Sequence, residues 1–344
     1  MADLTNRKQQ ILRAIIVEYV VGAEPIPSDL IAKKYDLGVR SATVRNEMAE
    51  ITDLGFLEQP HTSAGRIPSD SGYRYFVDRL AEPVAVAAAD QHTLTESLDE
   101  EEPLAQLLQA TTRALSRLTH LLTMATTLQN GSIIVRNAIL TVLGNNRSLL
   151  VLVLDTGATE NRFIELPAGA RNEDVYEANA VMAASLVGRP LRDLLRWKPS
   201  NNYRESVDAI LKKVAVTVRA AARELTKLQV VTEGEEFILA QPEFHRDVEA
   251  MQKVLSALDE GEDLKQVVSQ SDMPAITIGK EHDRENLTAL AVVRQSLVIG
   301  KDKVGTLAIV GPTRMDYMRV RALLEAAAQG VAHTLERGVR PRGA

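Results

Sequence analysis

The residues best suited to chemistry lie in the stretch ATVRNEMAEITDLG, which begins at Ala42. Its apolar residues recur at helical spacing, so Val44, Met48 and Ile51 share one face of a predicted helix. The opposite face places Asn46 among small residues. Asparagine can form two hydrogen bonds with adenine, and small neighbours let a helix approach the bases closely. This pattern is typical of a helix that enters the major groove of DNA.

Further residues suited to DNA contact surround this face. Arg40 lies near the start of the helix, where it can meet a phosphate, and Arg45 on the flank can contact guanine or phosphate. The loop HTSAGR, which ends at Arg66, offers hydroxyls, backbone N–H groups and a guanidinium, and Arg66 can also enter a narrow minor groove. The predicted DNA-contacting residues are Arg40, Ser41, Ala42, Thr43, Arg45, Asn46, Ala49, His61, Thr62, Ser63 and Arg66.

The charge balance leaves a second interpretation of this face open. Between Met1 and Leu80 there are 10 Lys and Arg against 11 Asp and Glu, and the whole chain carries a net charge of -6. A solvated helix face or a protein-docking module would have the same composition. Because salt screens charges beyond about 10 Å, a local basic patch can still attract DNA.

The remaining polar residues do not favour an enzyme. The six histidines lack the paired spacing of metal ligands, and the chain has no cysteine, no P-loop and no glycine-rich dinucleotide fingerprint. We therefore predict no catalytic residue, no metal site and no cofactor. No apolar run is long enough to span a bilayer, and the first residues lack the apolar stretch of a secretory signal. This predicts a cytoplasmic protein, associated with the nucleoid when bound to DNA.

The elements that position the DNA-contacting residues predict a helix-turn-helix followed by a small hairpin. Helical periodicity runs over 5–21, and a short second helix follows the break at GAEPIP. A glycine allows the tight turn before the third helix, which we place at 40–54. Residues 56–59 and 66–67 suit two short strands around a turn. Together these elements predict a winged helix over residues 1–80, which we call the head.

The chain after the head is predicted to contain a linker and an α+β body. Residues 81–103 contain alanine, proline and a cluster of acids but little core material, so we predict a linker there. Residues 104–128 suit an amphipathic helix, and strand-like runs then alternate with helices, one of these strands covering 235–244. The predicted fold class is α+β multidomain.

The stretch from Tyr203 to Leu228 predicts a long helix with an unbroken apolar stripe. Ordinary core packing explains this stripe. This is the favoured explanation; a seam against the same helix of a second subunit is the alternative, and the two can coexist along one helix. The candidate dimer contacts on the stripe are Val207, Ile210, Leu211, Val214, Val218 and Leu225.

Four blocks of the sequence resemble the HrcA family of bacterial heat-inducible transcription repressors. The first runs from Ala42 to Leu80, and the others are LAQPEF (Leu239 to Phe244), IGKE (Ile278 to Glu281) and VGTLAIVGPTRMDYMRV (Val304 to Val320). The resemblance implies a winged helix, a GAF-like domain built from 104–166 and 272–344, and a dimerisation domain inserted at 167–271.

The same resemblance implies a function. It predicts a repressor that binds double-stranded DNA as a homodimer, on an inverted-repeat operator upstream of chaperone operons, with the chaperonin as modulator. Two half-sites related by a twofold axis require a twofold protein. The alternative is a small-molecule-responsive regulator that uses the GAF-like domain as a sensor.

The corner GPTRMDY inside the last block admits two interpretations. It can be a strand-to-helix corner, in which Asp316 caps the last helix and Arg314 pairs with an acid elsewhere in the fold. It can also be a ligand site. The sequence alone favours the corner.

Overall fold

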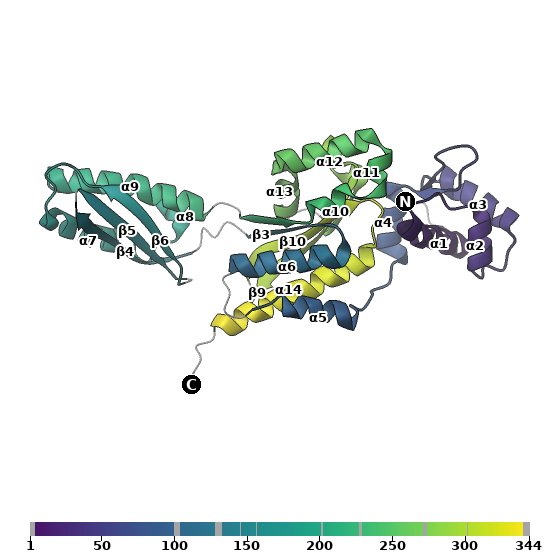
Figure 1. Ribbon diagram of the computed structural model, residues 1–344, viewed down its shortest axis with the longest axis horizontal. Helices are drawn as coiled ribbons and strands as arrows, with labels where there is room; N and C mark the ends of the chain where they lie inside the picture. The colour runs from purple at the N-terminus through teal and green to yellow at the C-terminus, as the bar shows by residue number, and fades with distance from the viewer. Residues whose placement is uncertain are drawn as a thin grey trace. The chain divides into compact units, whose positions relative to one another are not determined.

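The computed structural model describes residues 4–99, 104–127, 133–144, 146–155, 157–200, 202–226, 229–270, 274–300 and 302–339. The chain divides into two compact units (Figure 1). The first unit is Met1–Thr126 together with Val230–Ala344, and the second, which we call the inserted unit, is Thr127–Gln229. The two are described separately below.

The first unit begins with the helices and hairpin expected for the head. The helices are α1 (Asn6–Gly22), α2 (Ser28–Lys34) and α3 (Ser41–Asp53), and β1 (Leu57–Glu58) pairs antiparallel with β2 (Ile67–Pro68). Their apolar stripes meet in a core, which includes Leu12, Ile15, Ile16, Ile31, Val44, Met48 and Ile51. The prediction that Val44, Met48 and Ile51 face inwards is confirmed.

The rest of the first unit, which we call the body, is a five-stranded sheet between two layers of helices (Figure 1). The strand order is β7-β3-β10-β9-β8, and the pairs β3/β7, β9/β10 and β8/β9 are antiparallel. The strands are β3 (Leu122–Thr127), β7 (Val230–Glu233), β8 (Ile276–Ile278), β9 (Leu290–Ile299) and β10 (Asp302–Pro312). The helices are α6 (Leu104–Thr119), α10 (Glu235–Leu239), α11 (Pro242–Arg246), α12 (Val248–Glu260), α13 (Glu262–Ser269) and α14 (Tyr317–Val339).

Side chains alternate between the two faces of this sheet, and both faces are buried. Ala291 and Val293 of β9 belong to the core shared with α6 and α14, while Leu290 and Val292 belong to the core shared with α10 to α13. All four are at most 1% exposed. A strand buried on both faces reads as a continuous apolar run, which is what LTALAVV shows in the sequence.

The prediction of a strand over 235–244 is wrong, because these residues form α10 and α11. Gly234, with a φ of 90°, precedes α10 in a left-handed conformation. Pro242 occupies the first turn of α11, where its missing N–H costs no hydrogen bond. The short apolar run FIL suits either element, and helix packing against the sheet decides between them.

The predicted linker over 81–103 is also wrong for its described part. Residues Ala88–Glu96 form helix α5, which contacts α6 and α14 (Figure 1). Leu94 of this helix is 3% exposed and belongs to the core of the first unit. Since one buried leucine is enough to dock a short helix on an existing surface, composition alone did not reveal the contact. Residues 100–103 lie outside the described residues.

The inserted unit is an antiparallel meander of three strands with helices packed on one face. The strands β4 (Val135–Gly144), β5 (Arg147–Leu154) and β6 (Thr159–Glu165) pair in chain order. Helices α7 (Asn172–Leu186), α8 (Leu191–Leu194) and α9 (Glu205–Leu225) share its core. The predicted bounds of the insertion, 167–271, therefore need correction to 127–229. The apolar sides of α7, α8 and α9 are buried against the three strands β4 to β6, so these strands belong to the same unit. Helices α10 to α13 instead cover one face of the five-stranded sheet of the body.

One buried histidine of the body predicts how stability depends on pH. His282 is 4% exposed, and burial lowers its pKa, assisted by Arg294 and opposed by Glu281 and Asp283. In the unfolded chain a histidine takes up its proton near pH 6.5. Between that pH and the lowered native pKa only the unfolded state binds the proton, so stability is complete above about pH 6.5 and falls as the pH drops below it.

We therefore expect the His282→Gln variant to lose this acid sensitivity. The measurement is the urea midpoint at pH 7.5 and at pH 5.5, with the exposed His92→Gln variant as the control. Wild type and the His92 variant should lose more stability on acidification than the His282 variant. An identical loss in all three proteins would contradict the assignment.

Candidate nucleic-acid interface

Helix α3 presents the outward face that the sequence predicts. Ala42, Arg45 and Asn46 are exposed, Thr43 and Ala49 are half-buried, and Val44, Met48 and Ile51 pack inwards. The exposed face therefore combines an amide, a guanidinium and small side chains. Arg40, directly before the helix, is also exposed.

Two of the three acidic residues of α3, Glu47 and Glu50, are paired with α1, while Asp53 is exposed. Arg7 Nε donates to Glu47 at 2.9 Å, and Lys8 Nζ lies 2.7 Å from Glu50. The hydrogen bond to Glu50 is the main cause that raises the pKa of Lys8. Sequence reasoning did not single out Glu47, which is buried, although two basic residues at the start of α1 were a usable signal. The pairing offsets two negative charges near the face that carries Arg45 and Asn46.

The start of α3 is fixed by α2. Ser41 donates its hydroxyl to the carboxylate of Asp29, and the Ser28 and Ser41 hydroxyl oxygens lie 3.2 Å apart. The hydroxyl predicted to contact DNA is thus engaged within the head. Its observed contact joins the two helices of the turn, which helps to hold α3 in place relative to α2.

The loop between β1 and β2 is held in shape by a residue that sequence reasoning missed. Gln59 Nε2 donates to the carbonyl oxygens of Thr62, at 3.0 Å, and Ala64, at 3.1 Å. His61, Thr62 and Ser63 are exposed at the tip. A glutamine at the foot of a short loop was the only signal, and it is a weak one.

Arg66 lies at the base of the hairpin and not at the exposed tip of the loop. Its Nε donates to Thr52 Oγ1 of α3 at 2.9 Å. Its backbone N–H and carbonyl exchange hydrogen bonds with Ile26, both at 2.9 Å. The residue therefore connects the hairpin to α3 and to the segment before α2.

The side chains of α3 and the hairpin meet around a cavity of about 280 Å³. Arg45 of α3 and Arg66 of the hairpin both line it, together with Gln59 and the tip residues Thr62 and Ser63. Two guanidiniums, an amide and two hydroxyls suit the phosphate backbone of a nucleic acid. The cavity brings together four of the predicted contact residues from two separate segments.

The apolar stripe of α9 is core, not surface. Val207, Ile210, Leu211, Val214 and Val218 are each 0% exposed within the inserted unit, and Leu225 is half-buried against the same core. Leu228 lies outside the described residues. A fully buried stripe cannot contact a second chain unless the unit opens, so a dimer contact must use another face.

Another apolar face of the inserted unit is exposed. The side of the sheet opposite its helices carries Ile139, Leu149, Val151, Val153 and Phe163, which we call the outer sheet face. Ile139 pairs with Val151, and Leu149 pairs with Phe163, so these side chains are adjacent. Phe163 is 66% exposed and Ile139 41%. The Arg147 guanidinium lies 5.1 Å from the centre of the Phe163 ring.

The described residues contain neither a helix long and apolar enough to cross a membrane nor a group of three or more side chains placed to bind a metal ion.

Comparison with known proteins identifies the family. The family model "HrcA protein C terminal domain" matches residues 105–320. The heat-inducible transcription repressor HrcA of Moorella thermoacetica is 35% identical over 341 residues, covering 97% of this chain and 98% of that protein. The repressor of Desulforamulus reducens is 32% identical over 344 residues, with the same coverage.

A solved crystal structure, titled only as that of a hypothetical protein, shares the fold. It covers 98% of this chain and 100% of its own, with a TM-score of 0.67 and 19% identity. At this identity the likeness concerns the fold alone. Together with the near full-length similarity to named repressors, the match of the family model leads to one conclusion: the chain belongs to the HrcA family of heat-inducible transcription repressors.

Proposed function

We propose that the head is a winged helix-turn-helix that binds an operator, with α3 in the major groove and the hairpin on the adjacent backbone. The observation that carries this proposal is the division of α3 into two faces. Asn46 and Arg45 are exposed among small residues, while Glu47 and Glu50 pair with α1. A face of this kind approaches the bases closely and offers donors to their edges.

The charge of the head fits recognition of specific DNA bases better than non-specific electrostatic attraction to the DNA backbone. With 10 Lys and Arg against 11 Asp and Glu up to Leu80, the head as a whole does not attract DNA. The cations nearest the proposed interface, Arg40, Arg45 and Arg66, can neutralise a few phosphates. Each phosphate contact adds about 0.9 to the slope of log affinity against log salt, so we expect a shallow salt dependence.

We further propose that two copies associate through their outer sheet faces and bind an inverted-repeat operator as a homodimer. The face is apolar at its centre, with Arg147 and Glu165 opposite each other at its end. Two such faces related by a twofold axis can bury the apolar centres and leave the charged residues at the rim. The support is the exposure of Phe163 and Ile139 together with the burial of the α9 stripe.

The body completes the proposal. We infer that its five-stranded sheet and two helix layers form a GAF-like domain, that the operators lie upstream of chaperone operons, and that the chaperonin modulates repression in the cytoplasm. Family membership supports these points. The test is a gel shift with the promoter regions of the organism's own chaperone operons, with and without chaperonin. Equal binding to these promoters and to scrambled DNA would refute the proposal.

Replacing Asn46 with alanine should reduce specific binding. We expect a cost of about 1–3 kcal/mol on the operator and a much smaller cost on scrambled DNA, because a base contact is lost and phosphate contacts remain. The matched control is Asn6→Ala, the same change at an exposed position at the start of α1. The measurement is a salt titration of binding to both DNAs.

The Arg66→Ala variant should behave differently in the same titrations. It should weaken binding to operator and scrambled DNA by similar factors and lower the salt slope by about one, because a phosphate contact is lost. If Asn46→Ala weakened both DNAs equally while Arg66→Ala weakened only the operator, the two roles would be exchanged. If neither variant changed binding, α3 and the hairpin would not be the interface.

A further inference from the structure

Three segments of the body that are far apart in the sequence converge on the head. They are helix α11 (Pro242–Arg246), the turn IGKE (Ile278–Glu281) and the corner GPTRMDY (Gly311–Tyr317). DNA binding by α3 assigns no role to any of them. Their contacts with the head fall into two polar groups on either side of a pair of tyrosines.

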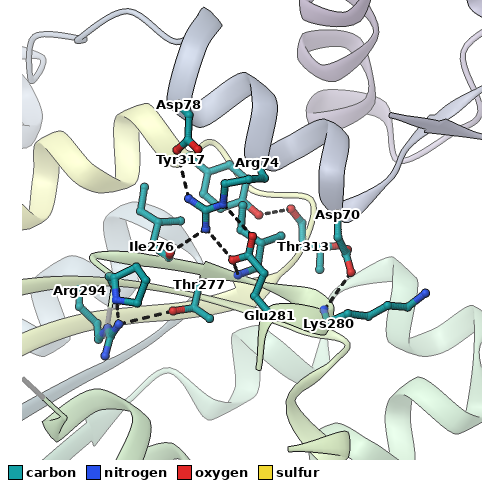
Figure 2. A network of polar contacts seen from close by, with 12 residues as sticks. Asp70, Arg74, Asp78, Ile276, Thr277, Lys280, Glu281, Arg294, Thr313 and Tyr317 are labelled. Atoms are coloured by element: carbon teal, nitrogen blue, oxygen red, sulfur yellow. Dashed lines mark hydrogen bonds and ion pairs between the residues drawn. The ribbon is translucent and has the colours of Figure 1, made fainter. Parts of the chain in front are cut away.

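The first group joins helix α4 (Asp70–Tyr75) of the head to the turn IGKE (Figure 2). Arg74 forms two parallel bonds to the Glu281 carboxylate, at 2.7 and 2.6 Å, and a third to the Ile276 carbonyl at 2.8 Å. Glu281 also accepts from the Ile278 backbone N–H at 2.8 Å, which holds the turn in place. A two-bond contact between guanidinium and carboxylate fixes direction as well as distance.

The turn is shaped to receive α4. The Asp70 carboxylate accepts from the Lys280 backbone N–H at 2.9 Å and lies directly over Gly279. A Cβ at Gly279 would lie 2.2 Å from an Asp70 carboxylate oxygen, and the φ of this residue is +52°. Only glycine can adopt this positive φ without strain and also leave room for the Asp70 carboxylate, so the turn and the helix fit each other closely.

The second group holds the end of α1. Arg314 of the GPTRMDY corner donates to the Val20 carbonyl and pairs with Glu243 of LAQPEF. Arg246 donates to the Ala23 carbonyl at 3.0 Å and lies 2.7 Å from Glu24. The last carbonyls of a helix lack partners within it and carry partial negative charge, so two guanidiniums are favourable there. The expected pairing of Arg314 with an acid is observed, within a corner that contacts the head.

The tyrosine pair lies between these groups. The rings of Tyr73 from α4 and Tyr317 from α14 have their centroids 5.8 Å apart, and each residue is 1% exposed. The Tyr317 hydroxyl donates to the Thr313 carbonyl at 2.6 Å, which ties the ring to the corner (Figure 2). The π-helical turn η1 (Phe76–Leu80) follows α4 directly.

We propose that these three segments form a docking seat that fixes the direction of α3 relative to the body. Asp70, Arg74, Glu281 and Arg246 act as positioning residues, and the body thereby sets the distance and angle at which the two heads of a dimer meet an operator. This inference rests on the proposed function. Partly exposed ion pairs each contribute little stability, so the seat determines orientation more than it strengthens the fold.

The experiment measures how operator affinity depends on the spacing between half-sites. A set of inverted repeats differs in spacing by single base pairs over one helical turn, and a single half-site serves for comparison. The test variant is Glu281→Gln with Arg246→Gln, one change at each contact group. The matched control is Glu249→Gln with Arg113→Gln, whose ion pairs with Lys253 and Glu233 lie within the body.

We expect wild type and the control to prefer one spacing at least tenfold over a spacing changed by about 5 base pairs, because half a helical turn moves the second half-site to the opposite side of the DNA. The test variant should show less than a threefold preference, since its heads can turn, while its half-site affinity stays within twofold of wild type. The half-site value separates loss of positioning from damage to the head.

Two outcomes would overturn the docking seat. One is a test variant that keeps the wild-type spacing preference, and the other is a wild type that binds half-sites specifically but has no spacing preference. Equal binding of wild type to operator and scrambled DNA would instead refute the proposed function. If the double variant melts well below wild type, the Glu281→Gln single variant, which keeps the side-chain shape, supplies the same comparison.

Discussion

Replacing Phe163 with aspartate should dissociate the proposed dimer and remove most of its affinity for the proposed operator. Phe163 is 66% exposed on the outer sheet face, next to Arg147, so an aspartate is well tolerated in the single chain. Between two packed sheet faces the same carboxylate is buried without a sufficient partner. Leaving such a charge in an interface costs about 3 kcal/mol or more. This corresponds to at least about a 100-fold weaker dimer.

The matched control is Tyr176→Asp. Tyr176 is 81% exposed and lies on α7, whose inner side packs on the opposite face of the sheet. Light scattering at micromolar concentration should give a dimer for wild type and the Tyr176 variant and a monomer for the Phe163 variant. A Phe163 variant that remains dimeric while the Tyr176 variant dissociates would place the interface on the helical side of the inserted unit.

Replacing Gly65 with valine should displace the hairpin from α3 and lower operator affinity at least about tenfold. A Cβ at Gly65 would lie 2.4 Å from the carbonyl carbon and oxygen of Ile26 and 2.7 Å from its nitrogen. Backbone atoms cannot move aside as a flexible side chain can, so the loop must shift and the Ile26–Arg66 bridge must break. The cost is about 3 kcal/mol, the upper part of the range for overpacking.

Gly22→Val provides the control for Gly65→Val. Gly22 belongs to the same head, and a Cβ there meets no atom within 4 Å. Gel shift and thermal melting of all three proteins make the comparison. The Gly65 variant should lose operator affinity and melt at a lower temperature, while the Gly22 variant should stay close to wild type. Unchanged operator binding by the Gly65 variant would show that the position of the hairpin does not matter for recognition.

The candidate interface was predictable where local periodicity decides orientation. The helical spacing of Val44, Met48 and Ile51 fixes their burial, and Asn46 follows on the opposite side. Contacts across the head were not predictable in this way. The bonds of Arg66 to Thr52, of Gln59 to the loop and of Ser41 to Asp29 depend on how separate segments pack.

The long stripe of α9 illustrates the limit of periodicity. An apolar stripe from Val207 to Leu225 predicts that one side of the helix is buried. It does not show whether the residues that cover this side belong to the same chain or to a second one. Only the presence of β4, β5 and β6 beneath it shows that the core of its own unit covers it. The outer sheet face could be recognised only in the structure for the same reason. Helices cover one face of the three-stranded sheet, and the opposite face is left exposed.

The sequence by itself determined the helices of the head, the buried and exposed sides of α3 and the family, since these depend on short-range spacing and on motifs that can be read directly. Tertiary structure decided three further features: the bounds of the inserted unit, the packing of α5 in place of a linker, and the seat that IGKE and GPTRMDY form for the head. Each of these depends on residues that are tens or hundreds of positions apart, such as Arg74 and Glu281. The physical reason is that hydrogen bonds and burial act through space, whereas periodicity reports only what one element exposes to its surroundings.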